Sequence, residues 1–127
     1  MSTPSSMRRL VTAAVSLPLL AGGFVALNAT SASADCGSHP AWQNLSSGAG
    51  RVTNSSPIRT GPYQSCDVVP NGQVGTSKDL FYHCWVLNRE GNKWTHVRVA
   101  NTTIEGWMYN GNLNDGGSTA PSNQCTA

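Results

Sequence analysis

The chain has 127 residues and carries eight basic and six acidic side chains. Residues 1–34 have the character of a targeting segment, which leaves 93 residues and room for one domain, too few for a large enzyme fold such as an eightfold β/α barrel. After residue 34 the charges balance at six against six and are scattered, so neither nucleic acid nor an anionic membrane is expected as a partner, because both are bound through clustered Lys and Arg.

The first 34 residues have the three parts of a secretory signal peptide. Two arginines precede an apolar run of about 18 residues, and Ala32 and Ala34 occupy positions −3 and −1 of a cleavage site before Asp35. The run approaches the length of a membrane anchor, but Pro18 and two glycines interrupt it. We therefore expect a secreted, extracellular protein that leaves the membrane once the signal is cleaved.

Outside the cell the cysteines are expected to pair with one another. Metal ligation by thiolates needs closely spaced cysteines, and no two of these are closer than 18 residues, so no metal site is predicted. Three connectivities are open to the four cysteines, Cys36, Cys66, Cys84 and Cys125.

The segment that follows the signal, residues 35–50, is rich in Gly, Ser and Pro. It is predicted to be a lead-in that is held in place only if Cys36 is bridged. Residues 51–76 mix short apolar pieces with turn residues, which excludes long helices. We expect one or two short strands there, around Arg51–Arg59 and Val68–Val74.

The clearest strand is predicted for Lys78 to Leu87. Both of its faces are largely apolar, which is typical of a central strand that is covered on two sides. Alternation divides its side chains between one face, with Leu80, Tyr82, Cys84 and Val86, and the other, with Phe81, His83, Trp85 and Leu87.

Two more strands complete an antiparallel meander. A hairpin loop at residues 88–92 leads to a strand from Lys93 to Val99, and a further turn leads to a strand from Ile104 to Tyr109. Gly106 in the last strand indicates a bulge or a close approach of two backbones. The Asn-, Gly- and Ser-rich tail is predicted to be irregular up to Cys125. About five short antiparallel strands favour an all-β fold, a small barrel rather than a two-sheet sandwich.

Four pieces of the sequence together resemble a bacterial SH3 domain of the small secreted kind. That family has a segment like V-R-S-G-P, a strand that enters a G-x-x-W-x-x-V hairpin, and a final strand like G-W-V. Order and spacing agree over residues 51–113, between the lead-in at 35–50 and the tail at 114–127. The matching pieces are Ile58-Arg59-Thr60-Gly61-Pro62, Tyr82-His83-Cys84, Gly91-Asn92-Lys93-Trp94-Thr95-His96-Val97-Arg98 and Gly106-Trp107-Met108.

The resemblance implies an SH3-like barrel and a link to the bacterial cell wall, often to peptidoglycan or its cross-bridge peptide. Many family members target a wall-cleaving domain to its substrate. This chain has no room for such a domain, so we expect a monomeric, non-catalytic binding module that needs no cofactor. The alternative is a soluble extracellular module that binds or inhibits another secreted protein.

Five residues are candidate ligand contacts. Arg59 either reaches a ligand carboxylate with its guanidinium or pins its own loop by bonding carbonyl oxygens, and the second reading is favoured. Trp94 either edges a groove or packs in the core, where Trp107 is also expected, and the core is the favoured reading for Trp94. Aromatic side chains in loop-like contexts can stack on sugars or peptides, and the chain places three of them there, Trp42, Tyr63 and Tyr109.

No catalytic constellation is predicted. The cysteines are expected to be paired and so provide no thiolate nucleophile. His83 and His96 can face one another across the hairpin, but two histidines without a nucleophile or a third ligand make a poor site, and cross-strand packing is the expected role. The six acidic residues show no pairing typical of a glycosidase.

The resemblance also bears on the disulfides. In an SH3-like barrel the two chain ends approach one another, which favours Cys36–Cys125 and leaves Cys66–Cys84. The pairing of Cys36 with Cys66 and Cys84 with Cys125 is nearly as plausible sterically, and the sequence does not decide between the two.

Overall fold

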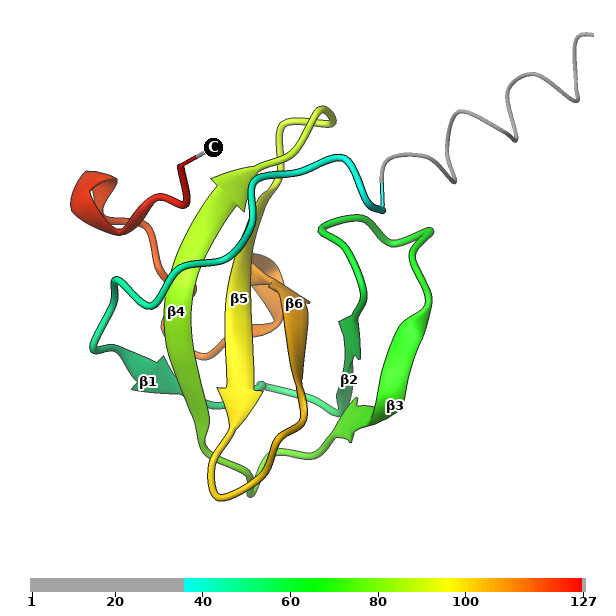
Figure 1. Ribbon diagram of the computed structural model, residues 1–127. Helices are drawn as coiled ribbons and strands as arrows, with labels where there is room; N and C mark the ends of the chain where they lie inside the picture. Colours follow the sequence, from blue (N-terminus) through cyan, green and yellow to red (C-terminus); the bar gives the residue numbers. More distant parts are fainter. Residues whose placement is uncertain (1–35, 127) are drawn as a thin grey trace, which may run out of the picture. The chain divides into compact units, whose positions relative to one another are not determined.

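The computed structural model describes residues 36–126, and they form an all-β domain in which one antiparallel sheet has the strand order β1-β4-β5-β6-β2-β3 (Figure 1). The all-β prediction is confirmed, with six strands rather than about five, because the lead-in contributes the short β1. The predicted signal, residues 1–34, lies outside the described residues. The elements are β1 (Ala49–Gly50), β2 (Ser56–Arg59), β3 (Val68–Val74), β4 (Leu80–Leu87), β5 (Lys93–Val99), β6 (Glu105–Tyr109) and the 3-10 turns η2 (Asn110–Asn112) and η3 (Pro121–Asn123).

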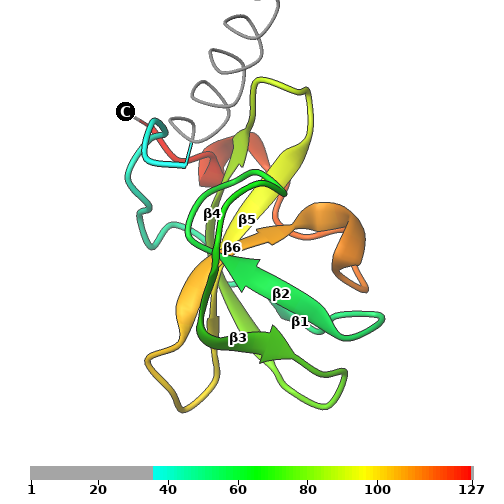
Figure 2. The same ribbon diagram turned by 90° about the vertical axis from the view of Figure 1, so that its right-hand side faces the viewer.

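The inner face of the sheet holds the larger apolar cluster, to which five strands contribute. β3, at one end of the sheet, and β4, next to the other end, meet in this cluster because the sheet curls around it, and Figure 2 shows this curl. Gly106 permits close contact between β6 and β2, because a Cβ there would lie 2.6 Å from the carbonyl oxygen of Arg59. The close approach predicted for Gly106 is thus confirmed. The cluster consists of Val52, Ile58, Val74, Leu80, Tyr82, Val97, Val99, Met108 and Leu113.

Strand β4 is an inner strand, as predicted, but it contains a bulge. Tyr82 and Cys84 pair with consecutive residues of β5, so the register shifts at His83. Directly paired residues share a face of the sheet, so Cys84 lies on the outer face with its partner His96. Trp85 returns to the same face as Tyr82. The predicted alternation therefore holds through His83 and is wrong from Cys84 onward, because a bulge inserts one extra residue into the period of two.

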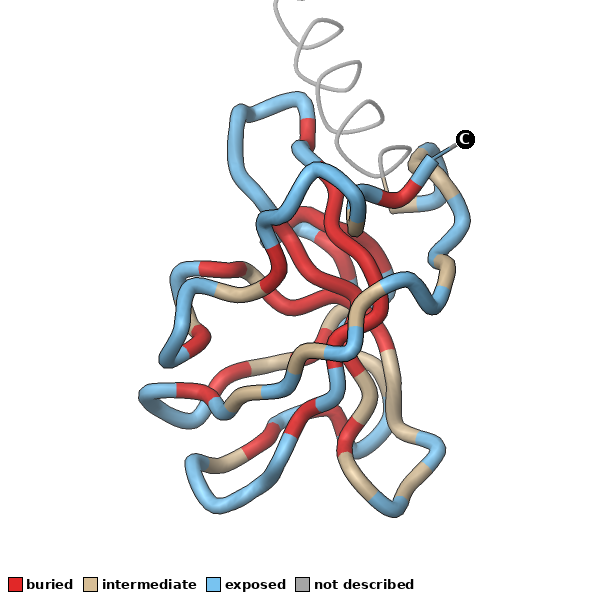
Figure 3. Tube along the Cα trace, turned by 90° about the vertical axis from the view of Figure 1, so that its left-hand side faces the viewer, coloured by how far each residue is buried: buried red, intermediate tan, exposed pale blue. Residues whose placement is uncertain are grey.

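The lead-in crosses the outer face of the sheet. Leu45 donates a backbone hydrogen bond to β4, Trp42 lies over β4 and β5, and His39 contacts β6. In Figure 3 the strands are buried through their middle, whereas the lead-in that crosses them is mostly half-buried or exposed. The path ends at the β2–β3 loop, where Cys36 is bonded to Cys66.

The disulfides follow from this path. Cys36 is bonded to Cys66 and Cys84 to Cys125, across 30 and 41 residues of sequence. The favoured pairing, Cys36–Cys125 with Cys66–Cys84, is wrong, and the alternative is confirmed. The reason is that the first residues of the lead-in lie beside the β2–β3 loop, while the tail ends beside β4. Gly61 allows Cys36 to approach the β2–β3 loop, since a Cβ at residue 61 would lie 2.6 Å from the carbonyl oxygen of Cys36.

The C-terminal tail is held by polar contacts as well as by its disulfide. Thr95 Oγ1 donates a hydrogen bond to Asn110 Oδ1 (2.6 Å) and accepts one from the backbone N–H of Ser118 (3.0 Å). All three residues are buried. Further along, the N–H of Cys125 donates to the carbonyl oxygen of Trp85 (2.8 Å), so the tail covers part of the edge of β4. The segment from Asn110 onward, predicted to be irregular, thus contains the two 3-10 turns and has a fixed place.

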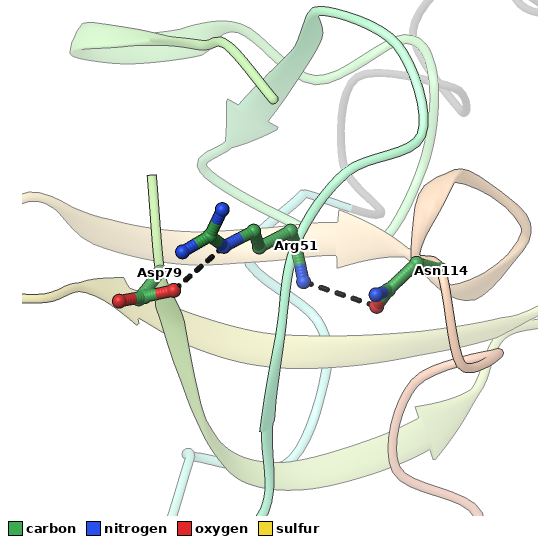
Figure 4. A network of polar contacts seen from close by, with 3 residues as sticks. All are labelled: Arg51, Asp79 and Asn114. Atoms are coloured by element: carbon green, nitrogen blue, oxygen red, sulfur yellow. Dashed lines mark hydrogen bonds and ion pairs between the residues drawn. The ribbon is translucent and has the colours of Figure 1, made fainter. Parts of the chain in front are cut away.

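Arg51 fastens the segment after β1 to two other parts of the domain (Figure 4). Its backbone N–H donates to Asn114 Oδ1 (3.1 Å), and its side chain forms an ion pair with Asp79 (2.7 Å). Both charged side chains are about half exposed, at 49% and 57%. An ion pair this exposed contributes at most about 1 kcal/mol.

Candidate functional site

Five aromatic rings meet on the outer face of β4, β5 and β6; we call them the histidine–tryptophan cluster: His39, Trp42, His83, His96 and Trp107. The indole of Trp42 stacks on the imidazoles of both His83 and His96, with ring centroids 4.4 Å and 4.6 Å apart. Trp107 meets His96 and His39 edge to face at 5.1 Å. Trp42 is 41% exposed, whereas the rings beneath it are buried. The lead-in therefore roofs a pair of histidines with one indole.

The two roofed histidines are hydrogen-bonded to each other. Their Nδ1 atoms are 2.8 Å apart, so one Nδ1 donates a proton and the other accepts it. Burial lowers the pKa of His96 to about 3, with smaller contributions from His83 and His39. Burial also lowers the pKa of His83, opposed by Glu105 and assisted by Arg98. Both imidazoles are therefore uncharged at neutral pH. The predicted facing of His83 and His96 is confirmed.

A carboxylate lies beside this pair. Glu105 begins β6, and its carboxylate and ring nitrogens of both histidines all lie within 4.8 Å of one another. Arg98 pairs with Glu105 across β5 and β6. The neutral imidazole pair is thus flanked by one anion and one cation from the same hairpin.

A groove of about 200 Å³ lies between the lead-in and strands β4 and β5; we call it the binding groove. Phe81 is 41% exposed, and the guanidinium of Arg98 lies 5.3 Å from the centre of its ring. The groove therefore offers an aromatic face, a guanidinium and several small polar groups within one hollow. Its lining includes Asn44, Ser46, Ser47, Phe81, His83 and Arg98.

A second and larger hollow, of about 420 Å³, lies between β3 and the β5–β6 turn. It has a single ionisable group and no aromatic ring, so it offers less chemistry for recognition than the binding groove. Its lining consists of Val69, Pro70, Asn71, Thr103, Ile104 and Glu105.

The structure does not bring the five predicted contact residues together. Arg59 donates to the carbonyl oxygen of Cys66 (2.9 Å), which confirms the favoured reading that it pins its own loop. Tyr63 is buried, and its hydroxyl oxygen accepts a hydrogen bond from the N–H of Arg89.

The other three lie elsewhere. Trp94 is 3% exposed and packs with the partly buried Tyr109 in a second apolar cluster, next to the Cys84–Cys125 disulfide. The expected core positions of Trp94 and Trp107 are confirmed. Trp42 is the most exposed of the five, at 41%, and it belongs to the histidine–tryptophan cluster. A ligand-binding role for these residues stays a prediction.

Sequence reasoning missed Phe81, Arg98 and Glu105. A signal for two of them was present, because the short turn between β5 and β6 fixes a register that sets Arg98 opposite Glu105 and His96 opposite Trp107. The contribution of the lead-in to the groove had no local signal in the sequence. It depends on a disulfide between two cysteines that are 30 residues apart.

Comparison of the chain with protein-family models, with curated proteins and with solved structures finds no match in any of the three. Within residues 36–126 no helix has the length and apolar character needed to cross a bilayer. All four cysteines are bonded in pairs, which fits an oxidising, extracellular environment. The assignment of a function therefore rests on the geometry of the domain.

Proposed function

We propose that this protein is a secreted, non-catalytic module with an SH3-like barrel that binds cell-wall peptidoglycan, its peptide or its glycan, in the binding groove. The order of the sequence motifs supports the barrel, as does β2, which pairs with both β3 and β6 and so joins the early strands to the last one. One observation carries the binding function: an exposed Phe81 and the guanidinium of Arg98 are held together in a hollow lined by small polar residues.

The chemistry of the groove suits such a ligand. An aromatic face packs against the apolar side of a sugar ring or a short aliphatic side chain, and a guanidinium binds a peptide carboxylate through two parallel hydrogen bonds. The serine hydroxyls and the Asn44 amide add donors and acceptors. The charges after residue 34 balance, so long-range attraction contributes little and binding should persist at moderate salt.

The first test is co-sedimentation of the oxidised protein with purified peptidoglycan sacculi at low and at moderate salt. Saturable binding that survives salt is expected. Phe81→Ala and Arg98→Gln should each weaken it about tenfold or more, which corresponds to about 1.4 kcal/mol.

Two matched controls separate the groove from general surface effects. Leu87→Ala removes an exposed apolar side chain from the other end of β4, where Leu87 is 56% exposed. Arg51→Gln removes an exposed cation that lies outside the groove. Both controls should bind sacculi as the unchanged protein does. Equal loss in controls and groove variants would contradict the groove as the binding site.

The alternative, a protein-interaction module, is favoured by a different observation. Trp42, Leu45 and Phe81 are all exposed, and all three flank the stretch of β4 around His83. Exposed aromatic and aliphatic side chains grouped in this way are common anchors of protein interfaces. If sacculi do not bind while the disulfides are intact, a secreted protein partner becomes the better hypothesis.

A further inference from the structure

We propose that His83, His96 and Glu105 form a binding site for a divalent transition metal, and that Cu²⁺ fits it best. Imidazole nitrogen and carboxylate oxygen are ordinary ligands of such ions. The three residues come from three adjacent strands, β4, β5 and β6, and their potential ligand atoms lie within 4.8 Å of one another. The sheet therefore fixes the positions of all three backbones.

The distance between the histidines indicates the geometry of the site. Two nitrogens each about 2.0 Å from one ion lie about 2.8 Å apart at a right angle, and about 3.3 Å apart in a tetrahedron. The two Nδ1 atoms are 2.8 Å apart. A hydrogen bond sets this spacing, and it equals the separation of adjacent ligands in a square-planar or tetragonal ion, the geometry typical of Cu²⁺. To bind such an ion, the rings have to turn so that both lone pairs face it. A tetrahedral Zn²⁺ ion would require the two buried rings to move apart.

The protonation of the pair is compatible with binding. The hydrogen bond between the two Nδ1 atoms needs one of them to be unprotonated, so at least one imidazole already offers a lone pair. At present one Nδ1 carries a proton for the hydrogen bond between the rings. To offer both Nδ1 lone pairs to a metal, that imidazole moves its proton to Nε2. The change is a tautomer shift, with no net release of protons.

The surroundings of the site provide an anion and a cover. Glu105 is partly exposed, so its side chain is able to turn towards the two nitrogens, and its charge offsets that of Arg98 nearby. Trp42 covers both imidazole rings. Its stacked indole gives the site an internal reporter, because Cu²⁺ quenches the fluorescence of a tryptophan in contact with its ligands.

The test is a titration of the untagged, oxidised, chelator-treated protein with Cu²⁺ and separately with Zn²⁺, followed by calorimetry and tryptophan fluorescence. We expect one equivalent of Cu²⁺ to bind with a Kd below about 10 µM, more tightly than Zn²⁺, and to quench part of the fluorescence. The electron paramagnetic resonance spectrum of bound Cu²⁺ should be tetragonal, with splitting from two nitrogens.

Three variants decide which residues hold the ion. Glu105→Gln should weaken Cu²⁺ binding about tenfold or more, while Glu90→Gln, which changes an exposed carboxylate in the β4–β5 loop, should leave it unchanged. In the electron paramagnetic resonance spectrum of His83→Gln, the nitrogen splitting from a second imidazole should be absent. Thermal melting of this variant checks that it is folded. Binding that is absent, that prefers Zn²⁺, or that is unaffected by both Glu105→Gln and His83→Gln would overturn the proposal.

The metal site does not rest on the proposed binding of peptidoglycan. Co-sedimentation with sacculi in the presence of a chelator tests the groove alone, and the Cu²⁺ titration without sacculi tests the metal site alone. Failure of either result leaves the other standing.

Discussion

The two faces of the sheet are built in different ways. The inner face is packed with aliphatic side chains and closed by the curl of the sheet itself. The outer face carries histidines and tryptophans, and it is covered by the lead-in, with the tail alongside β4, both of which end in disulfides. The inner face is therefore stabilised mainly by apolar burial, and the cover of the outer face mainly by covalent tethers.

This difference explains where chemistry is concentrated. Buried titratable side chains are costly unless they have partners. The larger apolar cluster contains one, Tyr82, whose hydroxyl donates a hydrogen bond to Asp115 Oδ1 (2.7 Å). On the outer face, the hydrogen bond between His83 and His96 and the indole of Trp42 make their burial tolerable. Both candidate sites, the groove and the histidine pair, lie under or beside the tethered lead-in.

Reduction of the two disulfides should have the largest effect on the stability of the domain. Closing loops of 30 and 41 residues is worth on the order of 4 kcal/mol each in the chain-entropy description. Together they rival the whole stability of a small domain. We expect the reduced protein to be largely unfolded at growth temperature, as followed by circular dichroism. Cooperative melting at a similar temperature after reduction would show that the inner face suffices alone.

Truncation of a side chain in the larger apolar cluster should have the next largest effect on stability. Ile58 is fully buried, and Ile58→Ala should lower the free energy of unfolding by about 2–5 kcal/mol, because it removes apolar contacts and leaves a cavity. Urea denaturation measures this loss. Leu87→Ala, at an exposed position of β4, should change stability by no more than about 0.5 kcal/mol. Similar losses for the two variants would contradict the assignment of the core.

Acid should weaken the outer face in particular. The pKa values of His83 and His96 are lowered in the folded protein, so the unfolded chain takes up protons first as the pH falls below about 6.5. The contribution of both histidines to stability is therefore fully present above that pH. It is lost as the pH falls, for His96 down to about pH 3, by up to about 1.4 kcal/mol per pH unit for each histidine.

The range from pH 6.5 to 5 is the informative one, because carboxylates begin to titrate below it. Urea midpoints of the metal-free protein should fall across this range, and the slope should be smaller for His83→Gln. A flat profile would mean that the two imidazoles are not held neutral by the fold.

Removal of the indole roof should have the smallest effect. Trp42 is 41% exposed, and Trp42→Ala removes two ring contacts, each worth about 0.5–1.5 kcal/mol. We expect a modest fall in thermal stability and faster hydrogen exchange at the backbone N–H of Leu45, which bonds to β4. Trp42→Phe keeps a stacked ring, so its thermal stability and exchange rate should lie between those of the unchanged protein and Trp42→Ala. No change in exchange would indicate that the disulfide alone holds the lead-in.

Local patterns predicted much of this fold. The three meander strands lie where alternation and turn residues placed them, and the facing of His83 and His96 follows from the hairpin between β4 and β5. The same patterns predicted the all-β class. These features depend on residues a few positions apart, so the sequence around them contains the necessary information.

The remaining features depend on contacts between distant segments. The bulge at His83 reverses the faces of the rest of β4, and no glycine in the strand indicates it. The disulfide between Cys36 and Cys66 depends on the path of the lead-in across three strands. Glu105 comes within reach of the histidines only because β6 pairs with β5. The sequence by itself determined the strands, the hairpins and the supply of chemical groups, since these follow from a period of two and from turn propensities. The tertiary structure decided the disulfide pairing, the groove and the histidine–carboxylate cluster, because each of them is set by the curl of the sheet and by where the two chain ends pass over it.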